Sequence, residues 1–287
     1  MRAPDPGIIL GLHRSRHERR LLTEALSLGI RRIDTSYNYL NFSSHSILSA
    51  ALGDLLDQFT VSTKVGFFAR GSAAAEHSLD PARLRLALEQ TNRDLQRAPD
   101  LVFLHNPERS LHGSPDSARD ALAQACGALE DAAASGLCRA WGIATWNPAP
   151  LSAAVDITLP RPSAFMVRAG LLVGIDALDA ADALATLWNL GTGQRWGMSP
   201  FGGNASSSVW EALDPRMFLQ DPAGGASRIQ AAFRAAYVLP RVGAVAVGSD
   251  DAVHLRELVA ALAYDADDAV ITQYRELLRQ RSRAHRA

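Results

Sequence analysis

Lysine is almost absent from this chain of 287 residues. Of its 29 basic side chains, Lys64 is the single lysine and the other 28 are arginine. The two types differ chemically, because surroundings can shift the pKa of an ammonium group whereas a guanidinium stays protonated. Lys64 lies in an apolar, β-branched stretch, residues 59–67, that we expect to form a buried strand. A buried ammonium group needs a partner, so Lys64 is a candidate functional residue; chance placement is the ordinary alternative.

Other absences narrow the class of protein. No apolar run of about 18 residues is present, so no transmembrane helix is predicted, and residues 1–12 lack the apolar core of a secretory signal. Cys126 and Cys138 share no metal-binding or redox spacing, and we expect buried thiols in a cytoplasmic protein without a metal site. Acidic and basic residues are balanced, at 30 and 29, so neither nucleic acid nor a membrane is expected as a partner.

Short apolar segments alternate with amphipathic segments along the whole chain. The patterns predict strands at residues 7–12, 30–34, 59–67, 100–104, 140–144, 164–167, 195–198 and 242–247. Helices are predicted around residues 22–26 and 122–129, and at 46–56, 81–95, 148–156, 177–190, 227–237, 251–263 and 267–283. Eight such units without a long linker predict one α/β domain over residues 1–287, a closed parallel (β/α)8 TIM barrel. The longest irregular stretch is residues 200–225, and its length is typical of a functional or disordered loop.

An open dinucleotide-binding sheet is the competing fold. That fold has a glycine-rich turn after its first strand. Here the corresponding turn reads His13-Arg14-Ser15-Arg16, which disfavours it.

Four ionisable residues fall at the ends of three consecutive predicted strands. Asp34 ends the second strand, Tyr39 follows it by five residues, Lys64 ends the third and His105 ends the fourth. In a parallel barrel these ends open on the face that carries the active site. We expect Asp34 to keep Lys64 charged, and the charged lysine to lower the pKa of Tyr39 so that the phenol serves as a general acid. His105 can donate a hydrogen bond to a carbonyl oxygen.

These residues and their order resemble the aldo-keto reductase family. The segment 29–39, which ends Asp34-Thr35-Ser36-Tyr37-Asn38-Tyr39, is similar to that family's signature, and further likeness is found at 62–64, 104–107, 199–203 and 247–257. The resemblance covers almost the whole chain. It implies reversible hydride transfer between a nicotinamide nucleotide, NADPH or possibly NADH, and a small carbonyl or alcohol substrate. Tyr39 would then protonate the forming alkoxide, and Lys64 and Asp34 would adjust the pKa of Tyr39. His105 would position the carbonyl.

The resemblance also implies a set of cofactor-binding positions. In this chain those positions are occupied by Thr145, Met166, Ser199, Pro200, Phe201, Gly202, Gly248, Ser249, His254 and Glu257.

Several of these positions depart from the family pattern around the nicotinamide. The family's Ser-Asn after strand five reads Ala144-Thr145, its strand-six glutamine is Met166, and the stacking aromatic before Ser-Pro is Met198. The basic residue expected near a 2′-phosphate is matched by Gly248 and His254. Each hydrogen bond that is not made is worth about 0.5–1.5 kcal/mol, so the cofactor is expected to bind more weakly or in a different way. Trp146, Arg168 and Trp196 are unassigned residues that we expect near the barrel mouth.

Three alternatives to a reductase remain open from the sequence. One is a non-redox enzyme that uses Tyr39, Lys64 and His105 for proton transfer, in an elimination or isomerisation. The second is a binding or regulatory barrel without turnover. The third, a Schiff-base aldolase built on Lys64, is disfavoured because Asp34 would keep the amine protonated. Substrate identity and oligomeric state have no signature in the sequence.

Overall fold

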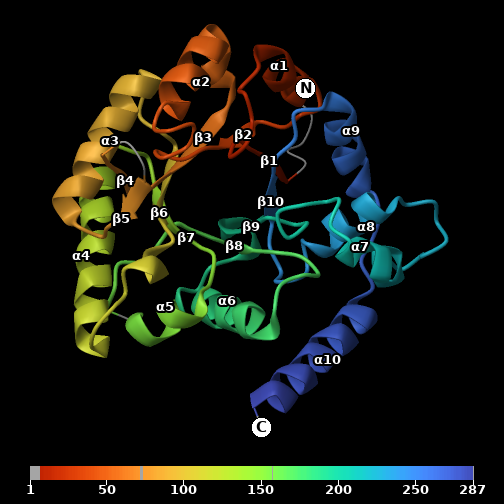
Figure 1. Cartoon of the computed structure of the whole chain (residues 1–287). Coiled ribbons are helices and arrows are strands. Elements are labelled where there is room, and N and C mark those ends of the chain that lie inside the picture. The colour runs from red at the N-terminus through yellow and green to blue at the C-terminus, as the bar shows by residue number, and fades with distance from the viewer. Residues whose placement is uncertain (1–6, 72–73, 157, 287) are drawn as a thin grey trace.

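The computed structural model describes residues 7–71, 74–156 and 158–286. In these ranges, eight parallel strands close into a barrel in the order β1-β10-β9-β8-β7-β6-β3-β2. Viewed as in Figure 1, helices surround this barrel. The barrel strands are β1 (Ile8–Gly11), β2 (Arg32–Asp34), β3 (Thr60–Val65), β6 (Leu101–His105), β7 (Trp141–Thr145), β8 (Ala164–Arg168), β9 (Arg195–Met198) and β10 (Ala244–Val247). The predicted (β/α)8 barrel is therefore confirmed.

A helix lies at each predicted helical segment, although α4 begins seven residues before its predicted segment and α7 falls in the stretch that was predicted to be irregular. Their bounds are α1 (Arg19–Ser27), α2 (Ser44–Leu52), α3 (Pro81–Leu95), α4 (Pro115–Ala134), α5 (Ala149–Ala154), α6 (Ile175–Leu187), α7 (Val209–Ala212), α8 (Arg228–Ala235), α9 (Ala252–Ala261) and α10 (Asp268–Arg286). Local chemistry sets several of their ends. At the start of α3 the Asp80 carboxylate accepts a hydrogen bond from the backbone of Arg83. After α1, Gly29 takes φ +81°, which terminates the helix as expected.

Two layers of apolar side chains hold the barrel together. The lumen is filled by a cluster that consists of Ile9, Leu101, Phe103, Ala144, Ala164, Met166, Trp196, Ala244 and Ala246. Alternate residues of the same strands, such as Ile143 and Phe165, face outward and pack under the helices. This alternation decides which strand residues face the lumen and its mouth. Both cysteines are buried free thiols, as expected.

One structural feature next to the site differs from the sequence prediction. The predicted strand 59–67 ends at Val65, because Gly66 turns the chain with φ +141°. Phe67 instead begins a separate antiparallel hairpin, β4 (Phe67–Arg70) with β5 (Ala74–His77). The hairpin follows β3 at the C-terminal end of the barrel, so it forms a wall beside the mouth.

The long segment 200–225 is partly helical, since it contains α7 and a 3₁₀ helix at Pro215–Phe218. At the C-terminus α10 packs against α6, and both Arg275 and Arg279 donate hydrogen bonds to the Asp179 carboxylate. Within the described ranges, no helix is long and apolar enough to cross a membrane. The prediction that residues 1–12 do not form a secretory signal falls partly on residues 1–6, which lie outside the described residues.

Candidate active site

Lys64 is the centre of the candidate active site. Its side chain is 2 % exposed, and its ammonium group contacts the Asp34 carboxylate. Nζ also donates a 2.8 Å hydrogen bond to the backbone oxygen of Thr35 and lies 3.4 Å from the Tyr39 hydroxyl. The structure thus brings residues from the ends of β2 and β3 together as the sequence predicts.

Asp34 has a second partner that fixes its orientation. The Ser62 hydroxyl donates a 2.8 Å hydrogen bond to Oδ1, which leaves Oδ2 for the lysine. Burial by itself would lower the pKa of Lys64, but Asp34 and then Tyr39 outweigh it, so the pKa of Lys64 is raised above its ordinary value. Lys64 is therefore charged at neutral pH, as expected for an ammonium group paired with a buried carboxylate.

The pKa of Tyr39 corrects one expectation. Burial raises it above the ordinary value of 10.0, and this effect exceeds the lowering caused by Lys64. The lysine acts in the predicted direction, but the predicted net lowering is wrong because it neglects desolvation of the phenolate. At neutral pH Tyr39 therefore carries its proton, which is the form that a proton donor requires.

His105 ends β6 and completes the group. Burial, followed by the charge of Lys64, holds the pKa of His105 well below its ordinary value, so the ring is neutral. Nδ1 lies 3.1 Å from the Ser36 hydroxyl oxygen. The rings of His105 and Tyr39 are 6.4 Å apart in an edge-on arrangement. Since Nδ1 is engaged with Ser36, Nε2 is the ring nitrogen available to a ligand.

Three residues beside this group were not singled out from the sequence. Phe67 stands edge-on to the rings of both His105 and His77, at 4.8 Å from each. His77 in turn lies with Nε2 2.7 Å from the backbone oxygen of His105. His13, from the turn after β1, packs edge-on against the Tyr39 ring at 4.9 Å. The β1 turn could have drawn attention to His13, but Phe67 and His77 depend on the hairpin.

The loop after β9 has a defined shape. Ser199 adopts φ +58° and its backbone oxygen accepts a 2.9 Å hydrogen bond from the amide of Gly202, which itself has φ +66°. Pro200 packs so closely on Gly170 that a side-chain carbon there would lie 2.6 Å from the Pro200 oxygen. Phe201 contacts Trp210 and Phe233. The four residues 199–202 thus form a tight turn at the C-terminal end of the barrel.

The positions expected to contact the nicotinamide do not all face the barrel lumen. Met166 is fully buried in the lumen cluster, and Met198 packs partly against that cluster. Ala144 belongs to the same cluster, so strand alternation turns the neighbouring Thr145 away from the lumen. The Thr145 hydroxyl is buried and has no hydrogen-bond partner among the described residues. Neither methionine offers a hydrogen-bonding group of the kind that an amide needs.

The positions expected to contact the adenosine half lie beyond β10. Gly248 packs against β1, where an added side-chain carbon would lie 3.2 Å from the Gly11 oxygen. Ser249 begins a turn by accepting a 3.1 Å hydrogen bond from the amide of Asp251, and His254 is exposed on α9. The Glu257 carboxylate accepts a 2.5 Å hydrogen bond from Ser227, the N-cap of α8. Glu257 therefore already has a structural partner.

Two of the unassigned residues meet at the mouth and the third does not. The guanidinium carbon of Arg168 lies 4.9 Å from the centre of the Trp146 ring, which is 45 % exposed. Glu108 accepts hydrogen bonds from the backbone amides of Trp146 and Asn147, and so anchors this loop. Trp196 is instead buried in the lumen, 5.3 Å from the Phe103 ring. The expectation that Trp196 lies at the mouth is wrong.

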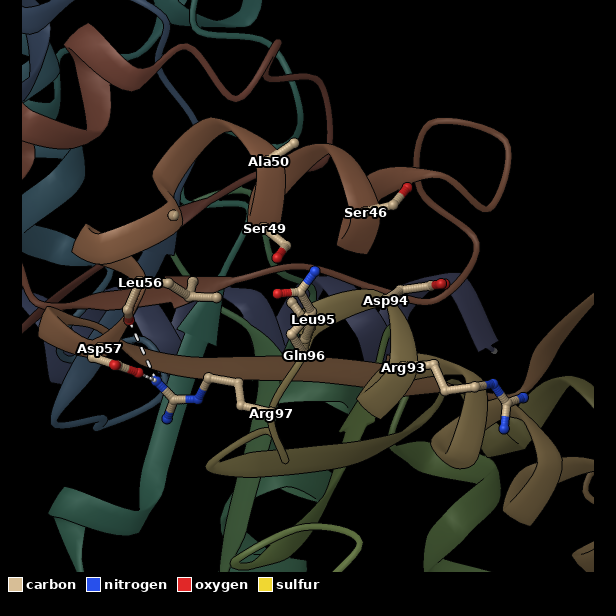
Figure 2. Close-up of a pocket in the computed structure, with 11 residues that line it drawn as sticks. Ser46, Ser49, Ala50, Leu56, Asp57, Arg93, Asp94, Leu95, Gln96 and Arg97 are labelled. Atoms are coloured by element: carbon tan, nitrogen blue, oxygen red, sulfur yellow. Dashed lines mark hydrogen bonds and ion pairs between the residues drawn. The ribbon is translucent and has the colours of Figure 1, made fainter.

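A separate groove of about 470 Å³ lies away from this site, between α2 and the end of α3. Figure 2 shows Arg97 in it, paired with Asp57 and with the backbone of Leu56. The residues at 53–58 and 93–97 precede β3 and β6, so the groove is at the N-terminal end of the strands. That end of a parallel barrel serves stability rather than catalysis, and the groove is not the candidate active site.

The closed barrel and the group of Asp34, Tyr39, Lys64 and His105 at its mouth can now be compared with known proteins. The sequence model of the aldo/keto reductase family matches residues 13–201. The chain belongs to this family. No curated protein sequence matches the chain significantly.

Solved structures of the family share the fold at low sequence identity. An aldo-keto reductase from Bacillus halodurans, in its holo form, is 20 % identical with a TM-score of 0.73, over 95 % of this chain and 91 % of that one. An aldo-keto reductase from Klebsiella pneumoniae in complex with NADPH is 19 % identical with a TM-score of 0.69, over 96 % and 91 %. A glycerol dehydrogenase from Gluconobacter oxydans is 17 % identical with a TM-score of 0.70, over 98 % and 93 %.

Proposed function

We propose that this protein transfers a hydride between a nicotinamide nucleotide and a small carbonyl or alcohol, with Tyr39 as the general acid and base. The observation that carries the proposal is the position of the Lys64 ammonium group, which contacts Asp34 and lies 3.4 Å from the Tyr39 hydroxyl. A protonated phenol beside a fixed positive charge can release its proton to a developing alkoxide, because the charge stabilises the phenolate that is left behind.

The residues at the mouth fit a nicotinamide nucleotide. The tight turn 199–202 gives a backbone surface, and Arg168 has a buried Nε without a hydrogen-bond partner among the described residues. Structural relatives from Klebsiella pneumoniae were solved with NADPH, and with NADP and acetate. These features support NADPH as the cofactor, with NADH as the second possibility. Ser199, Pro200, Phe201, Gly202, Gly248 and Ser249 would lie along it.

In the reductive direction, the nicotinamide would supply the hydride to the carbonyl carbon. The neutral His105 would orient the carbonyl oxygen through Nε2. Tyr39 would donate its hydroxyl proton to that oxygen, and the resulting phenolate would be held by Lys64, whose own charge is kept by Asp34. In the oxidative direction the phenolate would take the alcohol proton. Phe67 and His13 would shield the reacting oxygen from water on the hairpin side and the β1 side.

The experiment that tests this proposal is reduction of a panel of small aldehydes and ketones, followed by the decrease in NADPH absorbance. The wild-type protein should consume NADPH with at least one carbonyl of the panel, and the Tyr39→Phe variant should not. Consumption of NADPH at equal rates by both proteins would exclude Tyr39 as the acid. Conversion of a substrate without any nicotinamide nucleotide would instead favour the second candidate.

That second candidate is a proton-transfer enzyme, which catalyses an elimination or isomerisation. It is favoured by the lumen packing of Met166 and Ala144, since neither side chain can make the hydrogen bonds that the family pattern directs to the nicotinamide. The same Tyr39, Lys64 and His105 would move protons without a hydride. A Schiff-base mechanism is less compatible, because the raised pKa of Lys64 keeps the amine protonated and not nucleophilic.

A further inference from the structure

Arg168 lies beside the strand ends whose side chains cannot hydrogen-bond a nicotinamide. It ends β8 and shares the lumen face of that strand with Ala164 and Met166, because alternate residues of a strand face the same side. In the strand register Arg168 is opposite Met198 on β9. On the other side its guanidinium lies over Trp146, directly after β7. Arg168 thus lies between the β7 loop and the β9 turn, across the barrel from Asp34 on β2.

The guanidinium has hydrogen-bond donors to spare. Nε is buried and has no partner in the described part of the chain. Among the described residues, Nη2 has one hydrogen-bond partner, the backbone oxygen of Leu172 at a long 3.4 Å. Burial lowers the pKa of Arg168, and no charge in the described ranges offsets that effect. A partly buried cation with unused donors is costly unless a ligand supplies acceptors, so the arrangement indicates a polar ligand group at this point.

Trp146 makes this arrangement stable. Its ring gives the planar guanidinium a flat surface and a favourable cation–π contact. Its backbone is held in turn by the Glu108 carboxylate, which accepts hydrogen bonds of 2.8 and 3.0 Å from the amides of Trp146 and Asn147. Glu108 follows the end of β6 by three residues. The position of the guanidinium is therefore tied to the same strand end that carries His105.

We propose that Arg168 binds the carboxamide oxygen of the nicotinamide, in place of the side-chain hydrogen bonds that Ala144 and Met166 cannot make, and that Trp146 holds the guanidinium in position. Arginine has five N–H donors and no acceptor, so it contacts the oxygen of the carboxamide rather than its amino group. The Arg168 guanidinium, at the end of β8, can bind a ligand oxygen that Met166 and Met198 cannot bind. This inference rests on the proposed function, because it takes a nicotinamide nucleotide to be the cofactor.

The test compares binding of two ligands by calorimetry: NADP⁺, and 2′-phospho-ADP-ribose, which lacks only the nicotinamide. Arg168→Met should raise the dissociation constant of NADP⁺ at least about tenfold, equivalent to about 1.4 kcal/mol, and should change that of the fragment less than about twofold. Arg139→Met is the matched control, since Arg139 is 76 % exposed and precedes β7 at the opposite end of the barrel. The control should bind both ligands like the wild type.

Two further measurements separate the possible causes. Arg168→Gln keeps an amide donor and should bind NADP⁺ more tightly than Arg168→Met, and it also replaces that variant if the methionine protein does not fold. The 3-acetylpyridine analogue of NADP⁺ keeps the carbonyl oxygen but lacks the amino group. If Arg168 uses the oxygen, the methionine variant should lose affinity for the analogue as much as for NADP⁺.

The outcomes are distinguishable. Equal loss of affinity for NADP⁺ and the fragment would overturn the inference, because Arg168 would then bind the phosphates. Unchanged binding of both ligands would also overturn it, while the proposed function would stand. A wild-type protein that binds neither ligand would refute the proposed function itself, and the inference with it.

Discussion

The ammonium group of Lys64 contacts Asp34 on one side and lies 3.4 Å from the Tyr39 hydroxyl on the other. The single lysine of the chain is thus placed between a fixed anion and a phenol. The pKa of Lys64 is raised and that of Tyr39 is raised as well, so the resting site holds a charged lysine and a neutral tyrosine. In this state Tyr39 can donate one proton, and the charge of Lys64 can stabilise the phenolate that results.

Removal of the Tyr39 hydroxyl should affect turnover and little else. We expect Tyr39→Phe to lower kcat by about 10²–10⁴-fold, the usual contribution of a positioned acid, with nucleotide binding nearly unchanged. The ring should stay in place, because its contacts with His13 and His105 do not use the hydroxyl. Steady-state kinetics and NADPH titration of the same preparation check this. A phenylalanine variant with a near wild-type kcat would refute the assigned role.

Replacement of Lys64 should abolish activity even when the charge is kept. Lys64→Met removes the partner of a buried carboxylate, which typically costs about 3–5 kcal/mol of stability. Lys64→Arg keeps the charge, but a planar guanidinium does not fit the space between Asp34, Thr35 and Tyr39. Turnover and chemical denaturation of both variants measure these effects. An active arginine variant would mean that the lysine is an accident of composition.

Discrimination between NADPH and NADH should be weak. His254 is exposed on α9, and Arg256 already donates a 2.5 Å hydrogen bond to Glu24. We therefore expect NADPH to be favoured by less than about 100-fold, or ~2.7 kcal/mol. Glu24→Gln should release Arg256 and shift the preference toward NADPH, because an ionised phosphate binds a free guanidinium well. Side-by-side dissociation constants decide this, and a larger preference in the wild type would contradict it.

Acid should destabilise the fold through His45. This side chain is 1 % exposed and bonds to Thr63, and burial lowers its pKa to about 4 from an ordinary 6.5. Between those values the unfolded chain binds a proton that the folded chain does not, so stability falls as the pH falls from 6.5 to about 4. The loss of stability is of the order of 3 kcal/mol.

The matched variant for this effect is His45→Gln, which can keep the hydrogen bond to Thr63 but cannot titrate. Its free energy of unfolding should depend less on pH in this window than that of the wild type. His285→Gln is the control, because His285 is exposed on α10. The assignment to His45 fails if the His45→Gln and wild-type proteins lose stability in parallel as the pH falls.

The barrel and its four mouth residues could be predicted from the sequence because both depend on local patterns. Each strand is a short apolar run, and each functional residue ends a run or follows one closely, so topology alone brings Asp34, Lys64 and His105 together. The hairpin was not predictable in the same way. Its strands are four residues each, and the one glycine between them, Gly71, is a weak signal for a hairpin.

Two other properties depend on three-dimensional surroundings. The direction of the Tyr39 pKa shift depends on the balance between desolvation and the Lys64 charge. The effect of the charge can be predicted from the sequence, whereas the extent of desolvation cannot. The placement of Trp196 depends on which face of β9 enters the lumen, a choice that shifts with a register change of one residue. The proximity of Arg168 and Trp146 could be predicted, because they lie at the ends of two adjacent strands. The stacking of the guanidinium on the ring is seen only in the structure.

The central claim is that a nicotinamide nucleotide binds at this mouth and reacts there. It is tested most directly by calorimetric titration of the wild-type protein with NADPH and with NADH, repeated with Tyr39→Phe. We predict saturable binding of NADPH with one site per chain, and an unchanged dissociation constant in the phenylalanine variant. The absence of heat and of saturation with both nucleotides would contradict the account.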